Sequence, residues 1–250
     1  MSNLKSLILS LAIAGLLLPR ASSAREVVFL LHGLGSVPLS MWYLEDHLEE
    51  AGYTVRNLGY PSTHLPVGEA ADLVRREVDR AEAASRVHFV AHSLGSIVVR
   101  KMLEHEIPNL GRMVMIAPPN GGSLTAQRLQ DLDIFRWIFG PAGQQLAADN
   151  REFFQSLPIP PCEFGIIAGG KGDGEGFNLG LPGDDDGTVR VEETLLPGAA
   201  DFLLLRDTHT LILFDPETSR QAVHFLKEGR FEKPKEEGGR GEGATRRQGD

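Results

Sequence analysis

Apolar residues recur along this chain in two alternating patterns. Short runs rich in β-branched and other apolar residues, such as 27–31 and 113–116, predict strands covered on both faces. Between these runs, apolar residues are spaced three or four apart, as in 67–84, which predicts helices with one buried face. The expected strands are 26–31, 53–57, 86–91, 112–117, 163–168 and 201–205, and the expected helices are 40–51, 67–84, 94–105, 144–157 and 217–227.

The regular alternation of these elements predicts the fold class. Strands separated by helices form βαβ units, in which successive strands run parallel and the helices cover the sheet. We therefore predict an α/β fold, with a mainly parallel sheet of about six strands and helices on both faces. Sheets of this kind place their chemistry beyond the carboxyl ends of the strands, which directs the search for a site.

Both ends of the chain differ from this pattern. Residues 1–24 contain Lys5, an apolar stretch at 7–18 and small residues before a cut after Ala24, which predicts a signal peptide and export to the periplasm or the medium. An uncleaved N-terminal anchor is the alternative. Residues 232–250 are predicted to be a disordered tail, because from Lys233 onward no aliphatic or aromatic side chain is larger than alanine. Residues 25–231 form the expected folded domain.

Charge and cysteine content narrow the function classes. The formal net charge of −9 becomes −11 without residues 1–24, because that segment holds two basic residues, Lys5 and Arg20, and no acid. A protein this acidic is repelled by phosphate backbones, so we expect no nucleic-acid partner. The single cysteine, Cys162, cannot form an intramolecular disulfide, so a packed core must supply the stability.

A serine stands where the third expected strand meets the third expected helix, in Ala91-His92-Ser93-Leu94-Gly95. Small residues two before and two after a serine in a strand–turn–helix are typical of a nucleophile elbow. The N-terminus of the helix also favours negative charge that develops there. Taken alone, the same pattern fits a serine that only caps a helix.

The loop after the first strand, His32-Gly33-Leu34-Gly35, supports the interpretation of Ser93 as a nucleophile. Acyl transfer needs two N–H donors for an oxyanion, one from the residue after the nucleophile and one from this loop. Leu94 and Leu34 are the expected donors, since the flanking glycines let the backbone of Leu34 turn inward. A phosphate-binding glycine loop would need the spacing Gly-x-Gly-x-x-Gly, which this loop lacks.

A histidine and an acid follow in the order that such a serine requires. Beyond the fifth strand the histidines are His209 and His224; His224 falls within the last helix, whereas His209 lies in a loop directly after a strand. Asp186, beside Gly187, is the preferred acid, and Asp184 and Asp185 remain alternatives.

The run of three aspartates at 184–186 also fits other interpretations. It could be a solvated acidic loop, or it could contribute to a calcium site. A hard cation takes six or more oxygens, and one acidic run does not supply that number with certainty. We therefore expect no metal and no cofactor.

Together these segments resemble bacterial lipases and esterases of the α/β-hydrolase superfamily, in particular small Bacillus-type lipases and glycolipid-deacylase-like hydrolases. The similarity covers about residues 26–231. Two features depart from the family pattern and are expected to affect the pocket rim: Asn120 stands where many relatives carry histidine, and 169–183 is rich in glycine. The segments that carry the resemblance are 91–95, 32–35, 117–123, 186–189 and 208–210.

The resemblance implies an α/β-hydrolase fold and hydrolysis of carboxylic esters through an acyl-enzyme. Ser93 would attack, His209 would move the proton and Asp186 would orient His209. The amides of Leu34 and Leu94 would hold the oxyanion. An acyltransferase or thioesterase using the same residues is an alternative function, and a non-catalytic binding module on this scaffold is another.

Residues 123–161 occupy the position of a cap or pocket rim. Their aromatic cluster at 135–139 either lines an acyl pocket or touches a lipid surface, or else packs a helix onto the sheet. The expected substrate is a small-molecule or lipid ester, and transient contact with a lipid surface stays open. The acyl chain, the alcohol and the oligomeric state are not fixed by the sequence.

Overall fold

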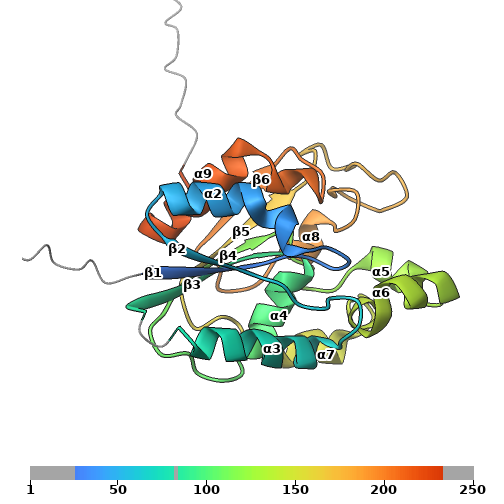
Figure 1. Ribbon diagram of the computed structural model, residues 1–250. Coiled ribbons are helices and arrows are strands. Elements are labelled where there is room, and N and C mark those ends of the chain that lie inside the picture. The colour runs from blue at the N-terminus through green and yellow to red at the C-terminus, as the bar shows by residue number, and fades with distance from the viewer. Residues whose placement is uncertain (1–25, 82–83, 233–250) are drawn as a thin grey trace, which may run out of the picture.

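The computed structural model describes residues 26–81 and 84–232 (Figure 1). The expected signal segment, 1–24, and the expected tail beyond Glu232 lie outside the described residues. Six strands form one parallel sheet in the order β2-β1-β3-β4-β5-β6, which confirms the predicted fold class. The strands are β1 (Glu26–Leu31), β2 (Thr54–Leu58), β3 (Arg86–His92), β4 (Leu110–Ile116), β5 (Phe164–Gly169) and β6 (Asp201–Leu205).

Helices cover both faces of this sheet (Figure 1). On one face lie α2 (Trp42–Glu50) and α9 (Pro216–Glu228), and on the other lie α3 (Val67–Asp79) and α4 (Leu94–Met102). In the part of the chain that the structure describes, no helix has both the length and the apolar character that a bilayer crossing requires. The remaining helices are η1 (Pro38–Met41), α5 (Leu124–Leu129), α6 (Asp133–Gln145), α7 (Arg151–Ser156), α8 (Val191–Thr194) and η2 (Leu211–Leu213).

Two hydrophobic clusters lie between the helices and the sheet. Neighbouring residues of a strand point to opposite faces, so Phe29 packs toward α3 and α4 while Leu30 packs toward α2 and α9. Both side chains are fully buried. Burial on two faces is the reason why these strands are almost continuously apolar.

The helix predicted over 144–157 is confirmed only in part. Helix α6 begins earlier, at Asp133, and ends at Gln145, and α7 begins only at Arg151. The aromatic cluster at 135–139 forms the first part of α6, and the helix bends at Gly140, whose φ is +57°. Pro141 follows and cannot donate a backbone N–H to the preceding turn. Because of these two residues, the sequence does not show the continuous helical spacing of apolar residues that would predict α6.

Candidate active site

Ser93 lies at a strained turn between β3 and α4. Its φ is +51° and its ψ is −123°, a backbone conformation that a residue with a side chain adopts only when its surroundings enforce it. The Ser93 amide donates to the carbonyl oxygen of Ile116 in β4 at 2.8 Å. A Cβ at Gly95 would lie 2.6 Å from the carbonyl oxygen of Leu31, so this position needs glycine. The neighbouring strands therefore hold the turn that carries the serine.

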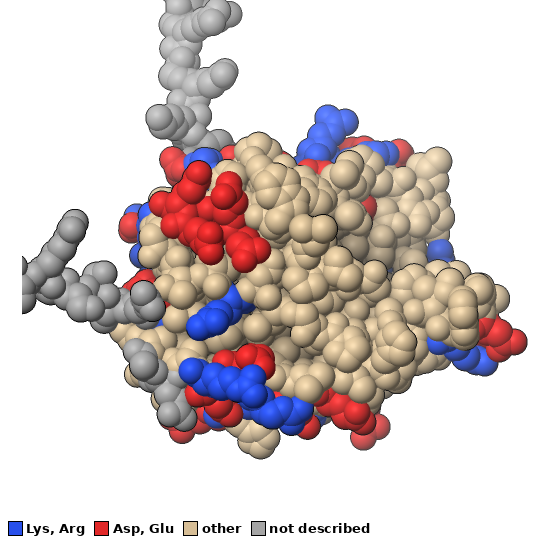
Figure 2. Space-filling model, viewed as in Figure 1, with Lys and Arg blue, Asp and Glu red and all other residues tan. Residues whose placement is uncertain are grey.

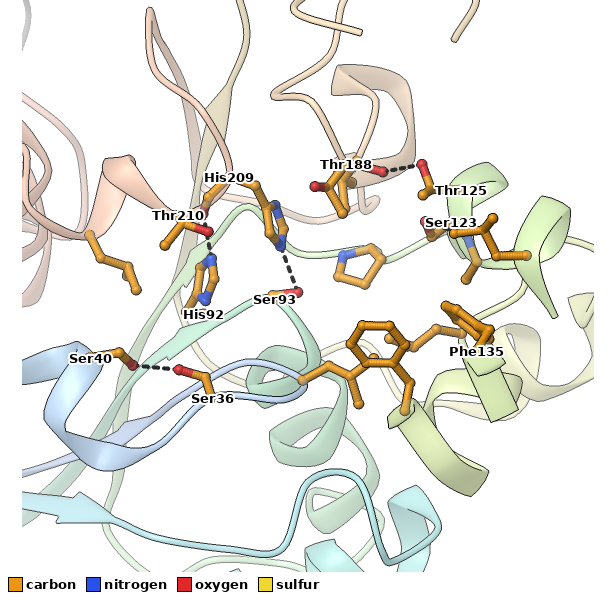
Figure 3. Close-up of a pocket in the computed structure, with 18 residues that line it drawn as sticks. Ser36, Ser40, His92, Ser93, Ser123, Thr125, Phe135, Thr188, His209 and Thr210 are labelled. Atoms are coloured by element: carbon orange, nitrogen blue, oxygen red, sulfur yellow. Dashed lines mark hydrogen bonds between the residues drawn. The ribbon is translucent and has the colours of Figure 1, made fainter. Parts of the chain in front are cut away.

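His209 and Asp186 meet this serine from two other strand ends (Figure 3). His209 follows β6, and its Nε2 lies 3.0 Å from Ser93 Oγ. Its Nδ1 lies 2.7 Å from Asp186 Oδ2, and the aspartate side chain is fully buried. The His209 amide also donates to the backbone oxygen of Asp186 at 2.8 Å. Three residues that are far apart in the sequence thus form one hydrogen-bonded chain.

The loop after β5 fixes the second oxygen of the Asp186 carboxylate. Asp186 Oδ1 accepts from the amides of Thr188 and Val189, at 2.9 and 2.7 Å. These two hydrogen bonds hold Oδ1 and leave Oδ2 directed to the histidine. The carboxylate can therefore hold one orientation of the imidazole.

Asp184 and Asp185 do not reach His209. The two carboxylates accept instead from backbone amides of the loop between β5 and α8, and the side chain of Asp185 is fully buried. The interpretation of this run as a solvated acidic loop is therefore wrong for Asp185, whereas Asp184 is half-buried. The donors to Asp184 are the amides of Lys171 and Gly172, and those to Asp185 are the amides of Asn178 and Gly187.

The calcium alternative gains no support from this geometry. Across residues 26–81 and 84–232, no group of three or more His, Cys, Asp or Glu side chains is placed to hold a metal ion. The carboxylates of the aspartate run serve instead as acceptors for the loop backbone and for His209.

The two expected oxyanion donors lie on either side of Ser93. Leu94 is the first residue of α4, and Leu34 lines the cavity above the serine. A Cβ at Gly33 would lie 3.2 Å from Ser93 Cβ, which shows how closely the loop after β1 approaches the turn. Within the described residues, neither the Leu34 nor the Leu94 amide donates a hydrogen bond to another group. Both amides are therefore available to a ligand.

His92, which has no predicted role, supports His209 through its backbone oxygen. Its Nε2 lies 2.8 Å from the backbone oxygen of His209, and the two ring centroids are 4.8 Å apart. Burial lowers the pKa of His92 to about 3, and the charge of His209 acts in the same direction. The neutral ring must therefore donate from Nε2, since the carbonyl can only accept. The available signal is a histidine directly beside the expected nucleophile, at the end of a mainly buried strand.

A cavity of about 230 Å³ opens above Ser93. Helix α6 contributes Phe135 and Phe139 to its wall, whereas Trp137 on the same helix is 83% exposed and Ile138 is also exposed. The aromatic cluster therefore divides between the cavity and the surface. Residues 169–183, which are expected to affect the pocket rim, contribute no lining residue to this cavity. The lining consists of Leu34, Ser36, Ser40, His92, Ser93, Pro119, Ser123, Thr125, Ala126, Leu129, Phe135, Phe139, Leu146, Thr188, Val189, His209, Thr210 and Leu213.

Asn120 is also not part of the rim, contrary to the prediction. It is buried, and its Oδ1 accepts from Arg100 Nη1 at 3.2 Å while its Nδ2 donates to the backbone oxygen of Thr194 at 2.8 Å. Arg100 is buried on α4 and also donates to the carbonyl oxygens of Leu157 and Pro158. Burial lowers the pKa of Arg100 to about 10. This pair joins α4 to three other segments below the cavity.

Comparisons with known proteins agree with this architecture. A family model described as the alpha/beta hydrolase family matches residues 27–223. A search of the curated proteins finds no match. Among solved structures, the mature form of a Bacillus licheniformis lipase is similar with 17% sequence identity and a TM-score of 0.63, over 82% of this chain and 92% of that chain.

Two further solved structures have comparable similarity. A metagenomic carboxyl esterase has 17% identity and a TM-score of 0.64, over 83% of this chain and 76% of its own. A phospholipase from Legionella pneumophila also has 17% identity, with a TM-score of 0.63, over 83% of this chain and 60% of its own. At these identities the likeness establishes the fold.

Proposed function

The chain belongs to the alpha/beta hydrolase family, and we propose that it is a serine hydrolase that cleaves carboxylic esters through an acyl-enzyme. One observation carries the proposal: a continuous hydrogen-bonded chain runs from Ser93 Oγ through His209 to the buried carboxylate of Asp186. Ser93, at one end of this series of hydrogen bonds, lines a mainly apolar cavity that suits the acyl part of an ester. The lipase and esterase names of the structural neighbours are consistent with that substrate class.

In the first step, Ser93 Oγ attacks the ester carbonyl carbon and its proton passes to His209 Nε2. Asp186 accepts from Nδ1–H throughout, so it fixes the tautomer and stabilises the imidazolium. The carbonyl oxygen becomes an oxyanion and accepts from the amides of Leu34 and Leu94. In serine hydrolases one such donor contributes on the order of 3 kcal/mol to the transition state.

The tetrahedral intermediate then collapses. His209 Nε2 gives its proton to the alcohol oxygen, the carbon–oxygen bond breaks, and the acyl group remains on Ser93 Oγ. A water molecule next attacks the acyl carbon while His209 Nε2 takes its proton. The bond between the acyl carbon and Ser93 Oγ then breaks, His209 returns the proton to Oγ, and the carboxylic acid leaves. His92 stays neutral during the cycle because its pKa is about 3, so it adds no positive charge beside the imidazolium.

The test is turnover of p-nitrophenyl esters by the wild type and by Ser93→Ala. We expect kcat/KM to fall by at least about 10⁴-fold in Ser93→Ala, because no other group supplies the nucleophile. A fluorophosphonate probe should add one label to the wild type and none to Ser93→Ala. Ser156→Ala is the matched control, because Ser156 is exposed on α7 and bonds only to the backbone oxygen of Phe153. It should react like the wild type.

Two results would overturn the proposal. One is a wild type that hydrolyses none of the esters and takes up no probe. The other is a Ser93→Ala variant that keeps its activity or is still labelled, since the nucleophile would then lie elsewhere.

A further inference from the structure

The cavity above Ser93 has two chemically different sides (Figure 3). In that view Ser36, Ser40 and Thr210 lie on one side of Ser93, and Ser123, Thr125 and Phe135 lie on the other. We call these the η1 side and the α5–α6 side. The α5–α6 side also carries most of the apolar lining, namely Leu34, Ala126, Leu129, Phe139 and Leu146.

On the α5–α6 side, the protein engages two hydroxyls of the lining. Thr125 Oγ1 donates to the backbone oxygen of Thr188 at 2.6 Å. Ser123 Oγ accepts from the Ala126 amide and so caps α5. Apart from these hydroxyls, this side offers a ligand mainly hydrocarbon surface, which suits an acyl chain.

On the η1 side, a directed pair of hydroxyls leaves an acceptor free. Ser36 Oγ donates to Ser40 Oγ at 2.8 Å, and Ser40 Oγ donates to the backbone oxygen of Val37 at 2.8 Å. A hydroxyl has one proton and two lone pairs, so Ser36 has given its proton away and can only accept from a ligand. A ligand group that meets it must carry an O–H or N–H.

Among the residues that the structure describes, no Asp, Glu, Lys or Arg side chain lines the cavity. Apart from His92 and His209, the eighteen lining residues are apolar or carry only hydroxyls. The surface over α5 and α6 is likewise largely free of charge in Figure 2, where charged residues gather at the tip of α6 and over the far end of the sheet. A phosphate or ammonium group in the cavity would lose its hydration without gaining a counter-charge.

The position of His209 decides which part of an ester occupies each side. Its Nε2 must protonate the leaving alcohol oxygen, so the alcohol lies toward His209 and the adjacent Thr210. Thr210 belongs to the η1 side, and the acyl chain is then left for the α5–α6 side. The alcohol part of the ester therefore extends toward Ser36.

We infer that the substrates are esters of an apolar acid with a small uncharged alcohol that keeps a free hydroxyl, and that Ser36 Oγ accepts a hydrogen bond from that hydroxyl. This inference rests on the proposed ester hydrolysis. It makes Ser36 a specificity-determining residue for the alcohol, and it separates the preferred substrates from phospholipids and choline esters.

The test compares alcohols at a constant acyl chain. Hydrolysis of the octanoate esters of glycerol, methanol and choline is to be measured for four proteins: the wild type, Ser36→Ala, Ser36→Thr and Thr125→Val. The measured quantity is the glyceryl-to-methyl ratio of kcat/KM, which we expect to be about fivefold in the wild type, the size of one neutral hydrogen bond. The choline ester should be the poorest of the three substrates.

The variants assign that preference to one oxygen. Ser36→Ala should lower the glyceryl-to-methyl ratio to about one, and Ser36→Thr, which keeps the hydroxyl, should restore most of it. Thr125→Val removes a hydroxyl from the opposite side and should change both rates by the same factor, so that the ratio stays at the wild-type value. Fluorophosphonate labelling of Ser93 verifies that each variant retains its site.

Different outcomes overturn the inference and the proposed function. A wild-type ratio of one or less, a preference for the choline ester, or a Ser36→Ala variant that keeps the wild-type ratio would overturn the inference alone. A wild type that hydrolyses none of the three esters and is not labelled at Ser93 would overturn the proposed function instead.

Discussion

The strand-end cluster and the α5–α6 wall enclose one cavity by different physical means. In the cluster formed by Ser93, Asp186 and His209, hydrogen bonds of 2.7 to 3.0 Å join the side chains, and backbone amides hold the remaining carboxylate oxygen. In the wall, α6 buries Phe135, half-buries Phe139 and exposes Trp137 and Ile138 to solvent. Its contacts with the cavity are made by hydrocarbon surfaces.

Because of this difference, we expect the strand-end cluster to determine the reaction rate and the α5–α6 wall to determine the substrate preference. Directional bonds at the ends of β3, β5 and β6 define one arrangement of the reacting groups, whereas apolar packing tolerates exchange of side chains of similar volume. We therefore expect substitutions in the cluster to change the reaction rate for every ester. Substitutions in the wall should change which ester is preferred.

The largest expected effect comes from Asp186→Asn. The amide has nearly the shape of the carboxylate, but it can present an N–H to His209 Nδ1 and so favour the wrong tautomer. We expect kcat/KM to fall by about 10³- to 10⁴-fold for all acyl chains alike. Asp184→Asn is the control, because Asp184 bonds to loop amides and not to His209. A selective loss for long chains would break the distinction between the two regions.

The sequence was sufficient to predict the cluster because its information is local or topological. The small residues around Ser93 mark the turn, and parallel strands bring their carboxyl ends to one edge of the sheet. The sequence could only favour Asp186 over its two neighbours, because it does not show where three adjacent carboxylates point. The fold of the loop directs Asp184 and Asp185 to backbone amides and Asp186 to His209.

The structure of the α5–α6 wall was harder to predict from the sequence, because tertiary contacts determine it. The bend at Gly140 and Pro141 interrupts the helical period, so the boundaries of α6 were missed. Asn120 was placed at the rim on resemblance alone, whereas its partner Arg100 lies twenty residues away in the sequence. No local pattern indicates a buried arginine paired with an amide.

A smaller effect tests the rigidity of the cluster through His92. Its pKa is about 3 in the folded protein and about 6.5 in the unfolded chain, so the unfolded chain binds the extra proton between these pH values. The stability that depends on a neutral His92 is therefore complete above about pH 6.5 and is lost as the pH falls toward 3. From pH 7 to pH 5 the loss should be about 2 kcal/mol for this group.

Urea unfolding of the wild type and of His92→Asn at these two pH values measures this contribution. Burial lowers the pKa of His32 and His88 as well, but both remain in the variant, so their contributions cancel in the comparison. The variant should lose about 2 kcal/mol less than the wild type between pH 7 and pH 5. Equal losses would show that His92 accepts a proton within the folded cluster.

The smallest expected effect is a change in acyl-chain preference, and it compares a cavity-lining residue of α6 with an exposed residue of the same helix. Phe139→Ala enlarges the cavity, while Trp137→Ala changes only an exposed side chain two residues away. Across p-nitrophenyl butyrate, octanoate and decanoate, Phe139→Ala should change the long-to-short ratio of kcat/KM by about tenfold, the scale of one or two methylene contacts. Trp137→Ala should change that ratio less than about twofold and the free energy of unfolding by less than about 0.5 kcal/mol. If Trp137→Ala changed the ratio as much as Phe139→Ala, the exposed face of α6 would contribute to selectivity, and the division between a buried wall and a neutral surface would fail.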